Sequence, residues 1–333
     1  MFPSFSELTE TGKRIAPFIH RTPVLTSRSL DEISGMSLFF KCENFQRVGA
    51  FKMRGATNAI LQLPVENRQK GVATHSSGNF AQALSLAARN SGLKAFIVMP
   101  QNAPSIKREA VLGYGAEIIN CASTLQARET TLNDVIARTG AFFIHPYNDI
   151  NVIMGQATAA MELIEDTGGL DIIIAPVGGG GLISGTAIAA HYMLPDAKIY
   201  AGEPFGADDA YHSLRKGEIV PSVNPETIAD GLRTSLGDKT FPIIKELVTD
   251  IIRVEESEII YAMRLIWERM KIIVEPSGAV PLAAVLREKK LFARKRIGII
   301  LSGGNVDLES ILFKLAGGIN EIKAINRNML EEK

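Results

Sequence analysis

Cysteine is nearly absent from this sequence, and its scarcity excludes two kinds of site. The chain has 333 residues, and Cys42 and Cys121 are its two cysteines. Two thiols are too few for a disulfide framework or a thiolate metal cluster, and they suit a reducing compartment such as the cytoplasm. The 5 histidines show no metal-ligand spacing, so we assign none of them a role.

A surplus of either charge is also missing. Lys plus Arg number 36 and Asp plus Glu number 36, so the formal net charge is zero. This balance predicts no nucleic-acid partner, and the lack of charge blocks predicts no disordered tail. The opening residues, MFPSFSELTETGKR, lack a basic segment followed by an apolar one, and we expect no signal peptide.

One long uncharged run needs interpretation. Residues 172–194 contain no Asp, Glu, Lys or Arg and are long enough to span a bilayer. Pro176 and the glycines at 178–181 interrupt this run. We therefore predict a buried strand, a glycine loop and a buried helix in a soluble protein, and no membrane partner.

Short apolar runs alternate with amphipathic stretches along most of the chain. The helical patterns FAQALSLAARNSG and LQARETTLNDVIARTG stop at Gly92 and Gly140. The expected strands are residues 94–100, 116–121, 141–144, 171–177, 198–204, 250–255 and 296–304. This alternation predicts an α/β fold with largely parallel sheets and helices on both faces.

Two polar, proline-containing segments divide the pattern. They cover residues 63–70 and 145–151. We expect a small mobile domain of residues 71–141, inserted into a large domain formed by residues 1–64 and 146–333.

A run of four glycines follows one expected strand and opens an expected helix, in PVGGGGLISG at 176–185. Glycine N–H groups can surround an anion, and the helix N-terminus adds a favourable dipole. The dinucleotide fingerprint G-x-G-x-x-G and the Walker A motif are both absent. The loop therefore favours a smaller phosphate ester, with an ordinary strand-to-helix turn as the alternative.

Two further loops end expected strands. THSSGNFAQA at 74–83 offers Ser76, Ser77 and Asn79 at a helix start, a good position for a substrate carboxylate. The alternative is a Ser or Asn N-cap. LSGGN at 301–305 places Ser302 at the open edge of a sheet, where ligands bind in this type of fold, although a turn residue is the alternative.

These motifs occur in a characteristic order. AFKMRGA at 50–56, HSSGN, PVGGGGLISG and LSGGN together resemble the fold-type II pyridoxal-phosphate enzymes, the tryptophan synthase β-like fold. The serine racemase and serine/threonine dehydratase (threonine ammonia-lyase) branch is the most similar. The resemblance implies two doubly wound, mostly parallel sheets, a large domain with a small inserted one, an amino-acid substrate and a homodimer.

The resemblance also implies roles for individual residues. Lys52 would be the Schiff-base lysine and, once freed, the general base at Cα. Phe51 would flank the cofactor ring, Asn79 would bind its phenolic oxygen, and Ser302 would meet its pyridine nitrogen. The glycine loop, namely Gly178, Gly179, Gly180 and Gly181, would hold the phosphate.

The same resemblance implies the reaction. A serine hydroxyl does not keep the pyridine nitrogen protonated, so the ring is a weaker electron sink and elimination is favoured. We expect L-serine or L-threonine to give a 2-oxo acid and ammonia, with Ser76, Ser77 and Asn79 binding the substrate. Ser77 matches the second acid/base of racemases, where threonine dehydratases usually have alanine. Serine racemisation is therefore expected too, with substrate binding as the alternative role of Ser77.

Two further sites follow from the resemblance. Glu203, Asp209 and the carbonyl of Ala207 match a site for Mg²⁺, Mn²⁺ or Ca²⁺, although taken alone EPFGADDA predicts a solvated acidic loop. Four residues match positions implicated in binding ATP as an effector, with ordinary surface or interface residues as the alternative. They are Gln82, Tyr114, Lys271 and Asn305.

Two departures leave the substrate side chain open. Phe80 replaces a histidine of the pattern, and Tyr147 replaces an asparagine. A different 3-hydroxy amino acid, such as 3-hydroxyaspartate or phenylserine, is therefore an alternative substrate. A nicotinamide-dependent oxidoreductase and a non-catalytic amino-acid sensor are the alternatives from other classes.

Overall fold

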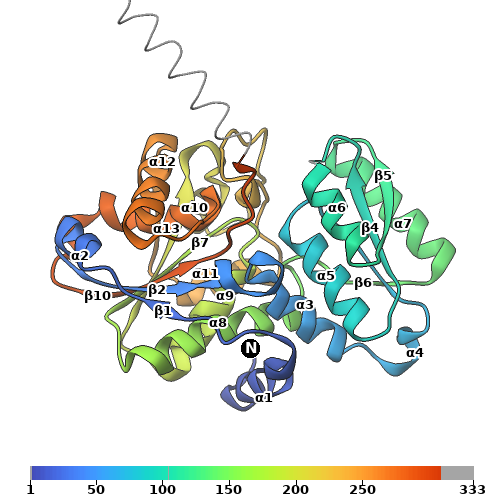
Figure 1. Cartoon of the computed structure of the whole chain (residues 1–333), viewed down its shortest axis with the longest axis horizontal. Coiled ribbons are helices and arrows are strands. Elements are labelled where there is room, and N and C mark those ends of the chain that lie inside the picture. Colours follow the sequence, from blue (N-terminus) through green and yellow to red (C-terminus); the bar gives the residue numbers. More distant parts are fainter. Residues whose placement is uncertain (1, 104, 309–333) are drawn as a thin grey trace, which may run out of the picture.

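The computed structural model describes residues 2–103 and 105–308. Figure 1 shows two lobes, each built on a sheet, with α3 lying between them. The helices of the described part are α1 (Phe5–Ile15), α2 (Arg28–Ser34), α3 (Lys52–Leu61), α4 (Val65–Arg68), α5 (Asn79–Asn90), α6 (Ser105–Gly113), α7 (Leu125–Thr139), α8 (Ile150–Thr167), α9 (Gly181–Met193), α10 (Asp209–Lys216), α11 (Thr240–Leu247), α12 (Glu256–Leu265), α13 (Pro276–Arg287) and α14 (Lys289–Phe292). Short 3₁₀ turns are η1 (Ala16–Phe18), η2 (Glu43–Phe45), η3 (Arg47–Gly49), η4 (Phe205–Ala207) and η5 (Asp230–Leu232), and the segment Ile266–Met270 is a π-helix.

The larger lobe is built on a six-stranded sheet in the order β1-β2-β10-β7-β8-β9. Its strands are β1 (Val24–Leu25), β2 (Ser37–Cys42), β7 (Ile172–Pro176), β8 (Lys198–Pro204), β9 (Asp250–Val254) and β10 (Arg296–Leu301). All neighbours are parallel except β1 and β2, which are antiparallel. The strand order reverses direction along the chain, as in a doubly wound sheet.

The smaller lobe carries a four-stranded parallel sheet in the order β5-β4-β3-β6. Its strands are β3 (Val72–His75), β4 (Ala95–Pro100), β5 (Glu117–Cys121) and β6 (Phe142–Phe143). These strands fall within or next to residues 71–141, for which the sequence predicts a small domain. That this segment moves as a unit stays a prediction.

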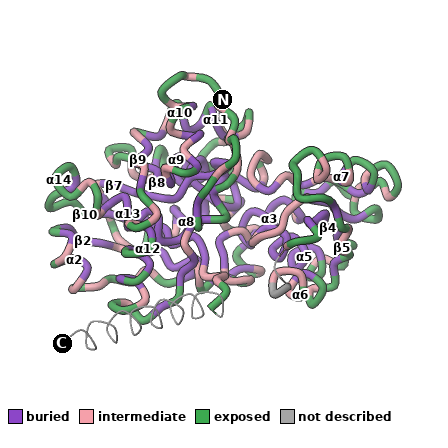
Figure 2. Tube along the Cα trace, turned by 90° about the horizontal axis from the view of Figure 1, so that it is seen from above, coloured by how far each residue is buried: buried purple, intermediate pink, exposed green. Residues whose placement is uncertain are grey.

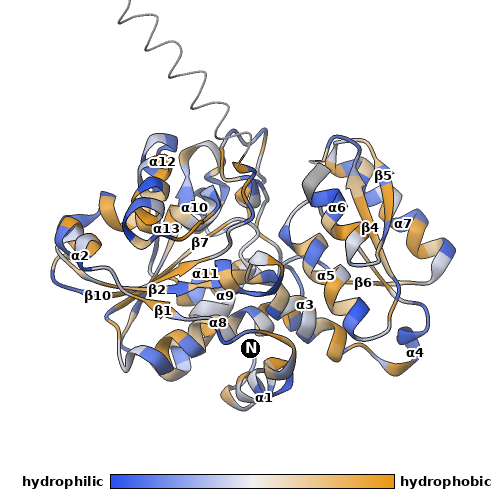
Figure 3. Cartoon of the chain, in the orientation of Figure 1, coloured by the Kyte–Doolittle hydropathy of each residue, from blue (hydrophilic) through white to orange (hydrophobic). Residues whose placement is uncertain are grey.

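Helices cover both faces of each sheet, so neighbouring residues of one strand enter opposite cores. Ile174 and Ile299 pack in the core beneath α12 and α13, whereas Ile173 and Ile300 pack in the core beneath α8 and α9. Figure 2 shows this continuous buried interior, and Figure 3 shows that the strands are largely hydrophobic. The observed layers confirm the predicted α/β fold with mostly parallel sheets.

Most expected elements are confirmed, and the exceptions have physical causes. The run at 172–194 forms β7, the glycine loop and α9, as predicted. None of the helices in the described part combines the length and apolar character needed to cross a bilayer. The pattern does not predict β1 or β2, because β1 has two residues and Lys41 interrupts the apolar run of β2. The segment at 63–70 also contains the short helix α4.

Candidate active site

Lys52 is the first residue of α3 and lies beside the segment that follows β10. The backbone N–H of Phe51 donates a hydrogen bond to the carbonyl of Ser302 at 3.0 Å. Ala50 forms an isolated antiparallel bridge with Gly303. These contacts bring two predicted site residues, distant in the chain, next to each other.

The Lys52 amine lies in a weakly polar environment. Its Nζ donates to the carbonyl of Pro146 at 3.0 Å and lies 5.0 Å from the ring centre of Phe51 and 5.7 Å from that of Phe80. Burial lowers the pKa of Lys52 to about 8, while the negative charge of Glu275 opposes this change. An appreciable fraction of neutral amine is therefore available near neutral pH, as a nucleophile or base requires.

The glycine loop between β7 and α9 is closely surrounded. A Cβ on Gly179 would lie 2.4 Å from the Tyr147 ring, and one on Gly178 would lie 2.8 Å from the Cα of Leu232. Gly180 has a φ of +89°, which favours glycine. Across residues 2–103 and 105–308, the N–H groups of 178–181 donate no hydrogen bond. Since buried N–H groups are normally paired, this loop fits an anion.

The loop between β3 and α5 forms a second group of free donors. Gly78 is the N-cap of α5, and its N–H donates to the Ser76 hydroxyl at 3.3 Å. The alternative of a Ser or Asn N-cap is therefore wrong. The N–H groups of Ser77 and Asn79 have no partner in the described ranges, so they remain available for a carboxylate.

Asn79 extends toward the larger lobe. Its Nδ2 donates to both carboxylate oxygens of Glu275, at 2.9 and 3.1 Å, and its Oδ1 accepts from Asn305 at 3.0 Å. Asn79 and Lys52 thus both lie beside the segment that follows β10. The glycine loop is linked to Lys52 through neighbouring residues, since Lys52 donates to Pro146 and the next residue, Tyr147, packs on Gly179.

A family model described as "Pyridoxal-phosphate dependent enzyme" matches residues 15–303. This chain belongs to that family.

Curated relatives and solved structures agree with the family. A serine racemase of Dictyostelium discoideum is 52% identical over 312 residues, covering 92% of this chain and 96% of the relative. A beta-hydroxyaspartate dehydratase of Paracoccus denitrificans is 48% identical, with 93% of this chain and 98% of the relative covered. The structure of maize serine racemase matches with a TM-score of 0.92 at 45% identity, covering 97% of this chain and 100% of that one. The expected fold-type II architecture is confirmed.

The region between the sheets fits the cofactor of a pyridoxal-phosphate-dependent enzyme. The unpaired N–H groups of the glycine loop suit its phosphate, and the Lys52 amine with its lowered pKa suits its aldehyde. Phe51, Asn79 and Ser302 lie where they could contact the ring, and these individual roles stay predictions.

A second group of predicted residues lies at the end of β8. Glu203 and Asp209 are both buried, and Glu203 accepts hydrogen bonds from the N–H groups of Ala210 and Tyr211 at 2.9 and 2.8 Å. Neither carboxylate oxygen of Asp209 has a hydrogen-bond partner among the described residues. The Ser222 hydroxyl and the backbone N–H groups of Asp209 and Leu236 lie close enough to lower the pKa of Asp209 without completing a hydrogen bond.

Burial makes the ionised forms of Glu203 and Asp209 unfavourable. It raises the pKa of Asp209 to about 7 and that of Glu203 well above its usual value, with repulsion from Asp209 adding to the latter rise. The described residues contain no cluster of three or more His, Cys, Asp or Glu side chains suited to a metal. The predicted set, with two carboxylates and the Ala207 carbonyl, still fits a hard cation, since buried charges need a partner.

The four residues predicted for a nucleotide are only partly brought together. Lys271 and Asn305 line one cavity of about 410 Å³ together with Phe45 and Ile273. Gln82 is buried in α5, and the Tyr114 ring lies 5.4 Å from the Arg89 guanidinium. Gln82 and Tyr114 do not line that cavity.

The two departures from the racemase pattern both lie near the site. Phe80 is buried with its ring near the Lys52 amine. The Tyr147 ring packs on Gly179 and lies 4.5 Å from the ring of His145. Burial raises the pKa of Tyr147 to about 12, so its hydroxyl keeps its proton at neutral pH.

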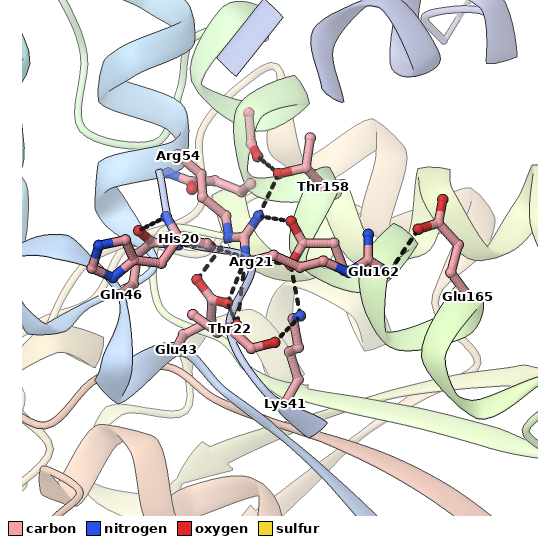
Figure 4. A network of polar contacts seen from close by, with 12 residues as sticks. His20, Arg21, Thr22, Lys41, Glu43, Gln46, Arg54, Thr158, Glu162 and Glu165 are labelled. Carbon is pink, nitrogen blue, oxygen red and sulfur yellow. Dashed lines mark hydrogen bonds and ion pairs between the residues drawn. The ribbon is translucent and has the colours of Figure 1, made fainter. Parts of the chain in front are cut away.

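The sequence did not predict the polar cluster behind Lys52, which Figure 4 shows. Arg54 is fully buried and binds the carboxylates of Glu43 and Glu162 with four hydrogen bonds of 2.7 to 2.8 Å. Lys41 also donates to Glu162, at 2.6 Å. Because Arg54 lies two residues after Lys52, this cluster holds the start of α3 against β2 and α8. A second basic residue two positions after Lys52 was the one available signal.

Close backbone contact between α3 and α8 fixes the same region. A Cβ on Gly55 would lie 2.7 Å from the Val152 carbonyl oxygen, and one on Gly155 would lie 2.5 Å from the Arg54 carbonyl oxygen. The N–H of Gly55 donates to the Gln156 side chain at 3.1 Å. Both glycines are needed for this crossing, which positions Lys52.

Proposed function

We propose that this protein removes water and ammonia from L-serine or L-threonine, giving a 2-oxo acid, and that it also racemises serine. The arrangement around Lys52 carries the proposal. Its amine has a lowered pKa and donates to Pro146, next to Tyr147, which packs on the glycine loop, and its amine lies near the Phe80 ring in the first turn of α5. The similarity to serine racemases supports the racemase part.

Each residue has a defined task in this reaction. Pyridoxal phosphate, when bound, supplies the electron sink that makes the substrate Cα proton acidic. The N–H groups of Ser77 and Asn79 bind and orient the substrate carboxylate. The Lys52 amine removes the Cα proton, and loss of the β-hydroxyl as water followed by hydrolysis releases ammonia and the 2-oxo acid.

Racemisation needs a second proton donor. After Lys52 has removed the Cα proton, a different proton must be delivered to the opposite side of Cα, and we assign that donation to the Ser77 hydroxyl. Ser77→Ala should abolish D-serine formation while ammonia release continues. D-serine formation at the wild-type rate in this variant would show that Ser77 does not perform the step.

The substrate side chain has a second candidate. The similarity to beta-hydroxyaspartate dehydratase favours 3-hydroxyaspartate, and the buried Phe80 ring favours a bulkier or more apolar substituent such as that of phenylserine. Purified protein should be incubated with L-serine, L-threonine, L-threo-3-hydroxyaspartate and phenylserine while the oxo acid and the D-enantiomer are measured in parallel. If the protein turns over none of these four amino acids, the proposal is wrong.

Lys52 provides the decisive control. Added pyridoxal phosphate should give a protein-bound visible absorbance band, and Lys52→Ala should lose both the band and all turnover. Lys13→Ala, a change of an exposed lysine on α1, should keep both. A nicotinamide-dependent oxidoreductase would show no such band, and a non-catalytic sensor would keep its ligand response in Lys52→Ala.

We also propose that Glu203, Asp209 and the Ala207 carbonyl bind a divalent cation, either Mg²⁺, Mn²⁺ or Ca²⁺. The unpartnered carboxylate of Asp209 supports this assignment. Oxygen ligands of this kind suit a hard cation.

An effector site for ATP is proposed at the cavity lined by Lys271 and Asn305. The Asn305 amide donates to Asn79, which links the cavity with the region around Lys52. Turnover should change as ATP is titrated, and Lys271→Gln should reduce that response. A flat wild-type response would remove this proposal, together with the roles proposed for Gln82 and Tyr114, which lie outside the cavity.

We propose a homodimer in the cytoplasm. Phe45 and Ile273 line the same cavity and are each 45% exposed, which suits contact with a second copy. Both cysteines are buried and unpaired, as is usual in a reducing compartment. Light scattering and localisation of the tagged protein in cells test the two statements.

A further inference from the structure

Glu275 immediately precedes α13 and is built into the wall of the site. Its side chain is 4% exposed, and its backbone N–H donates to the carbonyl of Gly303 at 3.0 Å. A Cβ on Gly303 would lie 2.7 Å from the Oε1 atom of Glu275. The glycine after Ser302 therefore leaves room for this carboxyl group.

The hydrogen bonds around Glu275 have a fixed direction. Asn305 donates to the Oδ1 atom of Asn79, and the Nδ2 atom of Asn79 donates to both oxygens of Glu275. A carboxylate can only accept hydrogen bonds, so it selects the nitrogen end of the Asn79 amide. The orientation of Asn79 therefore depends on the ionised form of Glu275.

Charges on three elements act electrostatically with Glu275. They are Lys52 on α3, Asp230 in η5 and Lys107 on α6. Burial raises the pKa of Glu275 to about 7, and Asp230 adds to this rise, while Asn79 and Lys107 oppose it. Glu275 in turn opposes the fall in the pKa of Lys52. In such a weakly polar region, each of the two opposite charges favours the other.

We propose that Glu275 is a positioning residue: its carboxylate fixes the Asn79 amide, and its negative charge stabilises the protonated form of the Lys52 nitrogen. The inference rests on the proposed function, in which that nitrogen receives the Cα proton. A buried base that gains a proton needs a nearby anion. Glu275 donates its backbone N–H to Gly303, which bridges Ala50, two residues before Lys52, so the buried carboxyl group belongs to the segment packed beside the lysine.

The test compares the holoenzyme with Glu275→Gln, which removes the charge and keeps the size. The pH midpoint of the visible band of bound cofactor follows the Lys52 nitrogen, and it should fall by about one unit. The kcat for L-serine should fall about ten- to a hundred-fold, as expected for loss of a charged hydrogen-bond partner, with a much smaller change in KM. Glu246→Gln, an exposed change on α11, should alter none of these values.

A wild-type midpoint and kcat in Glu275→Gln would overturn the inference. A wild-type protein that shows no band or turns over no hydroxy amino acid would instead overturn the proposed function. Should Glu275→Gln not fold, Asp230→Asn leaves Glu275 in place and makes it more acidic. The acid limb of its kcat profile should then move to lower pH, and an unchanged limb would also overturn the inference.

Discussion

Two buried groups of charged side chains differ in how their charges are balanced. Around Arg54, the two cations Arg54 and Lys41 face the two anions Glu43 and Glu162, and every charged atom has a partner (Figure 4). At the end of β8, Glu203 and Asp209 lie close together, and no basic side chain of the described part pairs with either.

The pKa values reflect this difference. Burial alone would raise the pKa of Glu162, but Arg54 and Lys41 outweigh it and hold the pKa below its usual value. The pKa of Asp209 instead rises to about 7, because burial is not offset by a cation. The first group is complete within the chain and serves to hold α3. The second has no cation among the described residues, and this difference is what supports the cation site proposed there.

Breaking the complete group should have the largest effect. Arg54→Met leaves the carboxylates of Glu43 and Glu162 buried without a counter-ion, and we expect a loss of about 3–5 kcal/mol in the free energy of unfolding. Chemical denaturation measures this loss. Arg28→Met removes an exposed pair with Glu32 and should cost about 0–1 kcal/mol. Equal effects of the two changes would contradict a structural role for the Arg54 group.

The incomplete group should respond in the opposite direction. The pKa of Asp209 in the folded state is about 7, above the value of about 3.9 expected after unfolding. The folded protein therefore binds this proton more tightly, and the contribution to stability falls as the pH rises from about 4 to about 7. Without added cation at pH 8, Asp209→Asn should stabilise the protein by about 1–3 kcal/mol.

A divalent cation should reverse that result. With Mg²⁺ or Ca²⁺ at about a hundred times its dissociation constant, the wild-type protein should gain about 2.7 kcal/mol, and Asp209→Asn should gain little. Asp196→Asn changes an exposed carboxylate outside the site and should keep the full response. Thermal melts with and without the cation measure both changes, and an unaltered wild-type melt would show that the pair binds no cation.

The contrast between these groups also explains what could be read from the sequence. The strand, glycine loop and helix at 172–194 form a local pattern, so the sequence was sufficient to predict β7 and α9, while the phosphate site between them stays a prediction. The Arg54 contact with Glu162 spans 108 positions, and the Asn79 contact with Glu275 spans 196. Contacts between residues so far apart in the sequence arise from tertiary packing, and local periodicity does not predict them.

The burial of charge is equally invisible in a single sequence. Lys41 interrupts an apolar run and so hides β2, although in the folded protein its amine is buried and paired with Glu162. The acidic loop EPFGADDA reads as solvated, yet Glu203 and Asp209 are buried. A charged residue is written the same way in a sequence whether it is exposed or buried. Its burial depends on residues of other helices and strands that pack against it.

A salt bridge between the two lobes provides the smallest effect, because it is neither buried nor incomplete. Lys107 on α6 lies 2.5 Å from Asp230 in η5, and the two side chains are 15% and 49% exposed. A double-mutant cycle with Lys107→Met and Asp230→Asn should give a coupling of about 0–1 kcal/mol that decreases with added salt. A coupling above about 3 kcal/mol that does not change with salt would instead equal the strength expected of the buried Arg54 group. The exposure of an ion pair would then not predict its strength in this protein.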